Sequence, residues 1–269
     1  MQHRITGLDR SLSFYASITA AKTLKVIQGN DNFAEGNGTV TVQAIESDDP
    51  LAYEMIFAKT GHEALHEWLT DYKVVEELRA ANNPFRFTIW NIIEDVRIED
   101  HARRTRLPGL NGRMRRLMDE WAARGVVAAA PENSPPGQVL GSYLLHQLRS
   151  EVLGHSALAP MAAVEEKMLA GTFPAGVLVR LRGLMARIRG LESTADARDL
   201  ADDILLMLKE EEQKERDRQN GGDAKEDTQG GGGTDEEQTS GADGDGADAG
   251  DQAGDGAEDG QDGEDGSEG

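Results

Sequence analysis

The large apolar side chains of this chain end at Leu208, and this limits what it can fold into. Residues 209–269 contain no valine, isoleucine, leucine, methionine, phenylalanine, tryptophan or tyrosine. Residues 210–269 hold 22 of the 49 acidic residues and 4 of the 28 basic ones, which accounts for −18 of the net charge of −21. Such a segment cannot offset its conformational entropy by burying apolar surface. We therefore expect a folded domain over residues 1–218 and a disordered Gly/Asp/Glu-rich acidic tail over residues 219–269.

The composition of the remaining chain excludes several classes of protein. Residues 1–209 carry 27 acidic and 24 basic residues, and a nearly neutral body with an anionic tail argues against nucleic-acid binding. The chain has no cysteine, so any metal must be bound by imidazole and carboxylate groups. No apolar run is long enough for a signal peptide or a membrane span. We expect a soluble cytoplasmic protein that binds neither nucleic acid nor membrane.

The pattern of apolar residues predicts a mainly α (α+β) fold with one small antiparallel β element near the N-terminus. Residues 24–29 and 39–45 have the composition and alternation of short strands. The dipeptide Asn37-Gly38, directly before the second strand, is a typical hairpin turn.

Helical spacing of apolar residues covers most of the rest of residues 1–218. One long helix is predicted over residues 51–78 and another over residues 85–104, with Asn-Asn-Pro between them. Shorter helices are predicted over residues 10–22, 109–123, 137–153, 160–170, 174–189 and 195–218.

The segment Gly-His-Glu-Ala-Leu-His, residues 61–66, contains two of the six histidines. His62 and His66 are four residues apart, so both project from one face of the predicted helix and can bind one ion. That face also carries Met55, Ala58, Leu65 and Leu69, so the imidazoles should point into the protein. Glu63 lies on the flank of this face, where it can reach a water on the metal without binding the metal itself.

This arrangement suits hydrolysis. A zinc ion held by protein ligands lowers the pKa of its water towards about 7, and a nearby carboxylate can take up the proton and deliver it to a leaving amine. The sequence thus predicts zinc binding by His62 and His66, with Glu63 as the general base. The alternative is that the two histidines are ordinary core residues, but the paired spacing and the position of the glutamate favour a metal site.

A catalytic zinc site needs a third protein ligand. The next predicted helix offers Asp95 and Glu94, and its apolar stripe consists of Phe85, Ile89, Ile92, Ile93 and Val96. Asp95 lies nearer to this stripe and is the favoured ligand. Glu94 is the second choice, either as a ligand or as a partner that orients a histidine. Glu99 and Asp100 are expected on a solvated face of the same helix.

The other histidines have no matching partners in the sequence. His101 lies beside Arg103 and Arg104 and is expected at the surface. His146 and His155 lack metal-binding spacing and are expected to be structural.

Three segments taken together, "FAEGNGTVTVQ", "GHEALHEWLTD" and "WNIIEDVRIED", resemble the N-terminal half of CobT-like proteins, relatives of the cobaltochelatase T subunit found in bacteria and their phages. Members show H-E-x-x-H followed by Thr-Asp, and Thr70 and Asp71 match that pair here. They also show N-x-x-E-D-x-R-I-E, in which Glu94 matches the first acidic position. A related group of metallopeptidases carries W-N-x-x-x-D, in which Trp90, Asn91 and Asp95 match the three fixed positions. The resemblance covers roughly residues 10–125 and implies a zincin-like domain in a bacterial cytoplasm, that of the host if the chain is phage-encoded.

The resemblance also implies partners and an alternative function. Family members usually continue into a von Willebrand A domain, whose D-x-S-x-S motif is missing here, so either that domain is a separate chain or the protein works without it. They work with an AAA+ ATPase of the MoxR or cobaltochelatase S type. Two hypotheses follow: a zinc metallopeptidase that acts on peptides or proteins, with the strand over residues 39–45 lining its cleft, or a non-catalytic assembly subunit that acts with the ATPase. The presence of Glu63 favours the peptidase.

Overall fold

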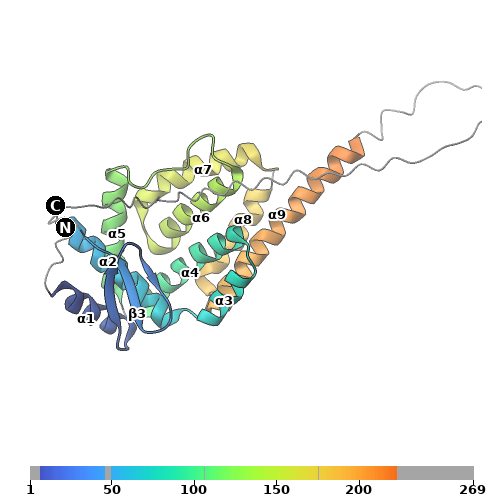
Figure 1. The fold of residues 1–269 in the computed structure, drawn as a ribbon. Helices are drawn as coiled ribbons and strands as arrows, with labels where there is room; N and C mark the ends of the chain where they lie inside the picture. The colour runs from blue at the N-terminus through green and yellow to red at the C-terminus, as the bar shows by residue number, and fades with distance from the viewer. Residues whose placement is uncertain (1–6, 46–49, 106, 175, 223–269) are drawn as a thin grey trace, which may run out of the picture. The chain divides into compact units, whose positions relative to one another are not determined.

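Helices form most of the structure, and a small sheet lies near its N-terminal end (Figure 1). The structure is a computed structural model that describes residues 7–45, 50–105, 107–174 and 176–222. These residues belong to one compact unit, Met1–Lys225, whereas the second unit, Glu226–Gly269, lies outside the described residues. The predicted fold class, mainly α with a small β element, is confirmed.

The sheet has three strands, β1 (Lys25–Gly29), β2 (Phe33–Ala34) and β3 (Thr39–Gln43), in the order β1-β3-β2. β2 pairs with β3 antiparallel, and the turn between them includes the predicted Asn37-Gly38. β1, however, pairs with β3 in parallel, so the expected antiparallel arrangement holds for only one of the two pairs. The sequence pattern missed β2 because two residues are too few to show an alternation.

The sheet shares a core with the first two helices, α1 (Leu8–Ala20) and α2 (Pro50–Leu69). Leu12 and Ala16 of α1, Val40 and Val42 of β3, and Ile56 of α2 are at most 1% exposed within this cluster. Serine side chains of α1 accept backbone N–H groups at the start of β1: Val26 of β1 donates to Ser13, and Leu24, directly before β1, donates to Ser17. The edge of β1 is thus covered, and β2 forms the other edge of the sheet.

The prediction of one helix over residues 51–78 is wrong, because the chain forms two helices there. α2 ends at Leu69 and α3 (Tyr72–Ala80) begins after Asp71, whose carboxylate accepts the backbone N–H of Lys73 at 3.0 Å. Threonine and aspartate side chains compete with helical hydrogen bonds and favour caps, so Thr70-Asp71 can end one helix and start another. Periodicity alone does not reveal such a break, since apolar spacing continues across it.

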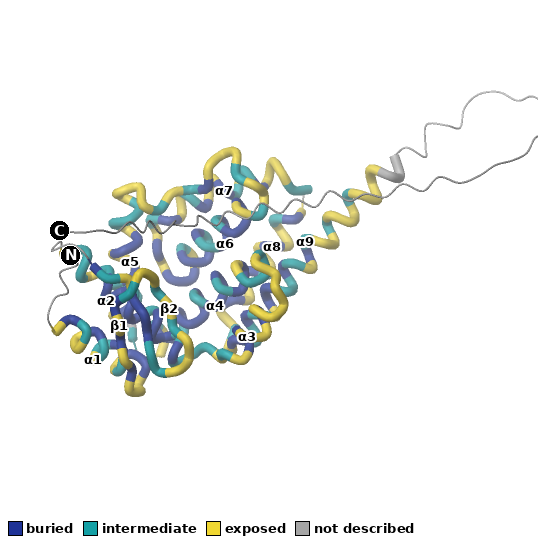
Figure 2. The backbone as a smooth tube through the Cα atoms, viewed as in Figure 1, coloured by how far each residue is buried: buried dark blue, intermediate teal, exposed yellow. Residues whose placement is uncertain are grey.

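α4 (Pro84–Thr105) runs through the middle of the helical part and is buried along most of its length (Figure 2). It contacts α2, α3, α5, α6 and α9. The remaining helices are α5 (Pro108–Ala123), α6 (Pro136–Leu153), α7 (Ala159–Thr172), α8 (Val177–Met185) and α9 (Thr194–Gly222). α9 thus includes the first residues of the predicted tail, and the rest of that segment, residues 223–269, lies outside the described residues. None of the described helices is both long and apolar enough to cross a membrane.

Candidate metal centre

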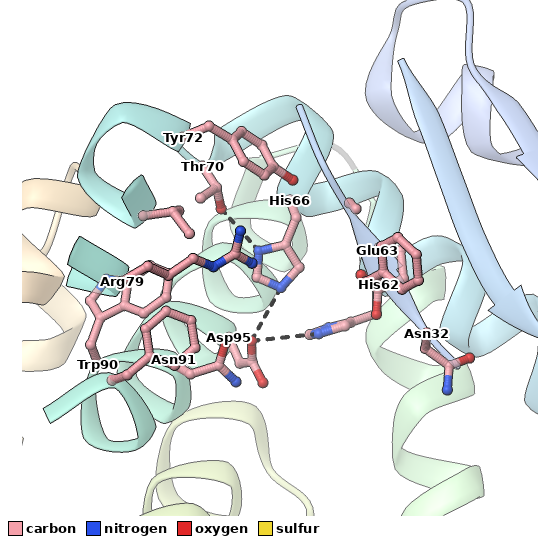
Figure 3. Close-up of a pocket in the computed structure, with 14 residues that line it drawn as sticks. Asn32, His62, Glu63, His66, Thr70, Tyr72, Arg79, Trp90, Asn91 and Asp95 are labelled. Carbon is pink, nitrogen blue, oxygen red and sulfur yellow. Dashed lines mark hydrogen bonds and ion pairs between the residues drawn. The ribbon is translucent and has the colours of Figure 1, made fainter. Parts of the chain in front are cut away.

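Three side chains from two helices meet at one point, and we call them the candidate metal centre: His62 and His66 of α2, and Asp95 of α4. The Nε2 atom of His62 lies 3.5 Å from Asp95 Oδ1, and the Nε2 atom of His66 lies 3.2 Å from the same oxygen (Figure 3). One ligand atom from each residue lies within 4.8 Å of the other two, so the group could hold a metal ion.

Close packing of α2 against its neighbours brings these residues together. Ala58 and Leu65, on the same side of α2 as the histidines, are fully buried in a cluster with Ile98 of α4. Gly61 is needed beside them, because a Cβ atom there would lie 2.6 Å from the Leu110 side chain and 2.9 Å from the Tyr15 hydroxyl. The apolar stripe that the sequence shows on α2 therefore does aim the imidazoles inward.

The distances and donor types fit a metal ion better than they fit hydrogen bonds. Charge-assisted N–H···O bonds are about 2.7–2.9 Å long, whereas ligands of a tetrahedral zinc, each about 2.0–2.1 Å from the ion, lie about 3.3 Å apart. Asp95 Oδ1 is buried and has no properly aligned hydrogen-bond partner among the described residues. Two imidazole nitrogens and one carboxylate oxygen form a donor set that zinc accepts.

The hydrogen bonds around His66 leave its Nε2 atom free to bind a metal. The Glu94 carboxylate can only accept, so the Thr70 hydroxyl, 2.8 Å away, must donate to it. The Thr70 oxygen therefore accepts from His66 Nδ1, 3.0 Å away, and this places the ring proton on Nδ1. Arg97 neutralises Glu94 through two bonds of 2.7 Å, and both side chains are buried. We call Thr70, Glu94 and Arg97 the Thr70 network.

His62 is held by a different pair of residues. Its Nδ1 atom lies 3.0 Å from Glu99 Oε1, although the approach is too oblique for a well-formed hydrogen bond. The same Glu99 oxygen accepts from Arg149 of α6 at 3.0 Å, and the second guanidinium nitrogen of Arg149 lies 3.6 Å from Asp95 Oδ2. Both imidazoles thus have an oxygen near Nδ1, which orients Nε2 toward the centre.

The electrostatics of the centre favour a cation. Burial opposes ionisation of Asp95, but the adjacent imidazoles outweigh it and hold the pKa of this carboxyl well below its usual range. Burial likewise opposes protonation of His62, but Asp95 and Glu99 raise its pKa well above its usual range. Glu99 has a pKa of about 2, because Arg149 and His62 outweigh the effect of burial. The carboxylates therefore favour positive charge at this point, and either a protonated His62 or a metal ion would supply it.

The centre lies in the wall of a cavity of about 300 Å³, and Glu63 lines the same cavity (Figure 3). Glu63 is 8% exposed and makes no hydrogen bond or ion pair with another described residue. Burial raises the pKa of its carboxyl, which makes the carboxylate a better proton acceptor. It follows His62 directly but is not one of the three residues of the centre.

The strand beside the cavity is β2, not the predicted strand over residues 39–45. Phe33 and Ala34 line the cavity together with Asn32, whereas β3 is the central strand of the sheet. Glu67 of α2 holds the turn after β2 in place: its carboxylate accepts the backbone N–H groups of Gly36 and Gly38 at 2.5 and 3.2 Å.

The structure separates the candidate site residues of the sequence into groups. It brings His62, His66 and Asp95 together and places Glu63 beside them, whereas Glu94 belongs to the Thr70 network and lies outside the three-residue group. This is the orienting role that was the alternative for Glu94.

The expectation that Glu99 and Asp100 are solvated is wrong. They are 4% and 3% exposed, and Asp100 pairs with Arg103 and Arg104. The prediction from helical geometry failed there because other helices cover α4 on several sides. Sequence reasoning also missed Arg149, which lies on α6, and no motif connects it to the centre.

No family model matches the chain, and searches of curated proteins and of solved structures find no significant match either.

Proposed function

We propose that this protein is a zinc-dependent peptidase of the H-E-x-x-H type. One observation carries the proposal: His62, His66 and Asp95 converge on the wall of an open cavity, and the carboxylate of Glu63, which pairs with no described residue, lines the same cavity. Metal ligands kept only for structure are usually four and closed off from solvent, whereas a catalytic site has three protein ligands and an accessible fourth position. The three-residue group beside a cavity matches the second kind and supports the proposal.

Different residues would bind the metal, transfer the proton and orient the imidazoles during hydrolysis. A zinc ion bound by the three ligands would supply a Lewis acid and lower the pKa of a bound water to about 7. Glu63 would take a proton from the water and pass it to the leaving amine. The Thr70 network and the Glu99–Arg149 pair would hold the imidazoles in the required tautomer and orientation.

The sheet offers a place for an extended peptide. β2 pairs with β3 on one side only, and its residues Phe33 and Ala34 line the cavity. Extended peptides commonly bind by adding a strand to such an open edge. Glu67, which binds the turn after β2, would keep this edge at a constant distance from the centre.

The test compares the parent protein with Glu63→Gln, both loaded with zinc. The amide keeps the shape of the side chain but cannot accept the proton, so zinc content should be unchanged while cleavage of a peptide library falls by about 10²- to 10⁴-fold. Glu54→Gln is the matched control, because it makes the same change on α2 at a residue that does not line the cavity. This control should cleave like the parent.

Two outcomes would overturn the proposal. If Glu63→Gln cleaved as fast as the parent, with both activities sensitive to a chelator, Glu63 would not be the base. If zinc-loaded parent cleaved nothing in casein or a broad peptide library, we would favour the assembly subunit that acts with an AAA+ ATPase and a separate von Willebrand A domain protein.

A further inference from the structure

One positively charged side chain lines the cavity beside the candidate metal centre. Arg79, near the C-terminal end of α3, is exposed, and its guanidinium points into the cavity (Figure 3). Among the described residues that line the cavity, Arg79 is the only lysine or arginine. The acidic residues there, Glu63 and Asp95, already have roles in the proposed reaction.

Among the described residues, Arg79 has no carboxylate partner of the kind that Arg97 and Arg149 have. Arg97 is bound by Glu94, and Arg149 is bound by Glu99. Arg79 forms no ion pair with any described carboxylate, and its guanidinium carbon lies 5.9 Å from the centroid of the Phe87 ring. Stacking on an aromatic ring orients a guanidinium while leaving its N–H donors available.

The side chains around Arg79 define what it can bind. Val75, Phe87 and Trp90 line the cavity near it, so a ligand would meet an apolar wall and one cationic fork. Elsewhere in the cavity Glu63 and Asp95 would repel an anion. Apart from a metal ion at the centre, Arg79 is therefore the group among the described lining residues that favours an acidic group, and a guanidinium fork matches the two oxygens of a carboxylate.

The hollow surface continues beyond Arg79. A second depression shares Arg79 and Phe87 with the cavity and is also lined by Asn82, Asn83 and Thr88. A peptide chain that passes the metal centre could therefore continue past Arg79. Asparagine and threonine side chains can donate and accept hydrogen bonds to a peptide backbone there.

We infer that Arg79 binds a carboxylate of the substrate and makes this site selective for acidic peptides. The inference rests on the proposed peptidase function and specifies its substrate class. The carboxylate can come from an aspartate or glutamate side chain near the scissile bond or from the C-terminus of the peptide. Continuation of the surface past Arg79 favours a side chain within the peptide.

The experiment uses the zinc-loaded full chain and pairs of peptides that differ in one group. In one set, glutamate is compared with glutamine at each position around the cleavage site; in the other, a free C-terminal carboxylate is compared with its amide. A charge-assisted hydrogen bond favours the acidic peptide, so kcat/KM should be about 10- to 100-fold higher for it at one position. Preference in the first set identifies a side chain, and preference in the second identifies the terminus.

Variants show whether Arg79 causes the preference. Arg79→Gln should lose it, Arg79→Lys should retain part of it, and Arg79→Glu should prefer lysine at that position over glutamate. Lys73→Gln is the matched control, since it removes one positive charge from α3 at an exposed residue that does not line the cavity. It should keep the preference of the parent, and equal loss in both variants would show a general charge effect and overturn the inference.

A binding measurement separates this inference from the peptidase proposal. Fluorescence anisotropy of labelled peptides with zinc-loaded Glu63→Gln reports binding without cleavage. Tighter binding of the acidic peptide, lost in Glu63→Gln/Arg79→Gln, supports the inference even if the parent cleaves nothing. Cleavage or binding with no difference between acidic and amide peptides overturns it while leaving the peptidase proposal intact, and absence of any binding overturns it as well.

Discussion

This protein has two pairs of histidines, and each pair includes a histidine beside a carboxylate. The two pairs differ in how far their side chains are exposed. His62 and His66 have side chains that are 14% and 13% exposed, and both meet Asp95 at the wall of a cavity. His146 and His155 are 3% and 0% exposed, and neither lines a cavity described for this structure. We call the first pair the cavity histidines and the second pair the sealed histidines.

The sealed histidines show that a nearby carboxylate does not make a metal site. His146 Nδ1 lies 3.0 and 2.9 Å from the two oxygens of Glu165, and the backbone N–H of Ala130 also donates to Glu165. This carboxylate is thus satisfied without a metal. The cavity histidines differ because two imidazoles share one oxygen, and that oxygen has no other partner in the part of the chain that the structure describes. A shared ligand atom without a hydrogen-bond partner among the described residues, next to open space, distinguishes the candidate metal centre.

The largest predicted effect is on zinc content. Asp95→Asn should lose stoichiometric zinc, because the amide carries no negative charge and binds zinc poorly. Glu94→Gln makes the same kind of change one residue away and should still bind about one zinc per chain at saturation, since Glu94 contacts Thr70, Arg97 and Thr194 and lies outside the centre. Zinc is measured by mass spectrometry after dialysis. The reverse result would assign the third ligand to Glu94.

Substitution of the sealed histidine His146 should instead lower the free energy of unfolding. Among the described residues, His146→Leu leaves the buried Glu165 carboxylate with only the Ala130 N–H, and loss of a hydrogen-bond partner of a buried polar group destabilises by about 1–3 kcal/mol or more. Urea unfolding should show this loss, whereas zinc content of the folded protein should not change. The double variant His146→Leu/Glu165→Leu should recover much of the stability. Loss of zinc in folded His146→Leu would remove the distinction between the two pairs.

The residues that orient the cavity histidines should tune zinc affinity without abolishing binding. Thr70→Val and Glu99→Gln should each weaken zinc binding by about 10- to 100-fold, because partners of this kind orient the imidazoles and raise their basicity. Competition with a chromogenic chelator measures the affinity. Thr70→Ser keeps the hydroxyl and should bind like the parent. Equal affinity in Thr70→Val and Thr70→Ser would show that the hydroxyl does not act on His66.

The smallest effect concerns the second sealed histidine and pH. Neither ring nitrogen of His155 has a hydrogen-bond partner among the described residues, and burial lowers its pKa to about 4. A neutral folded form is thus favoured, so its contribution to stability is present above the unfolded pKa of about 6.5 and is lost as pH falls toward about 4.

His155→Leu tests this contribution. Between pH 7 and pH 5 the parent should lose about 2 kcal/mol of unfolding free energy that the variant does not lose. The two unfolding curves are compared at each pH, which cancels the carboxylates common to both. Identical pH dependence of the two proteins would show that His155 is accessible to protons in the folded state.

The sequence by itself determined several features of this protein. The apolar stripe on residues 55–69 turned the two histidines inward, because a helix buries its apolar face wherever it packs. The helical positions of Asp95 and Glu94 favoured the first as the residue that faces the histidines, and the structure places it there. The Asn37-Gly38 turn is found between β2 and β3. Each of these follows from local geometry and from the chemistry of nearby residues.

Only the tertiary structure decided the rest. Thr70 ends α2 and joins His66 to Glu94 in one network, and Arg149 reaches Glu99 from a helix 50 residues further along the chain. β2 forms the edge at the cavity because β3 lies in the middle of a mixed sheet. Arg79 lines the same cavity from α3, a helix separate from α2. The spacing of apolar residues does not predict which distant charge neutralises a buried carboxylate. It also does not predict which edge of the sheet stays open. Those depend on how the helices pack, and packing is a property of the whole domain.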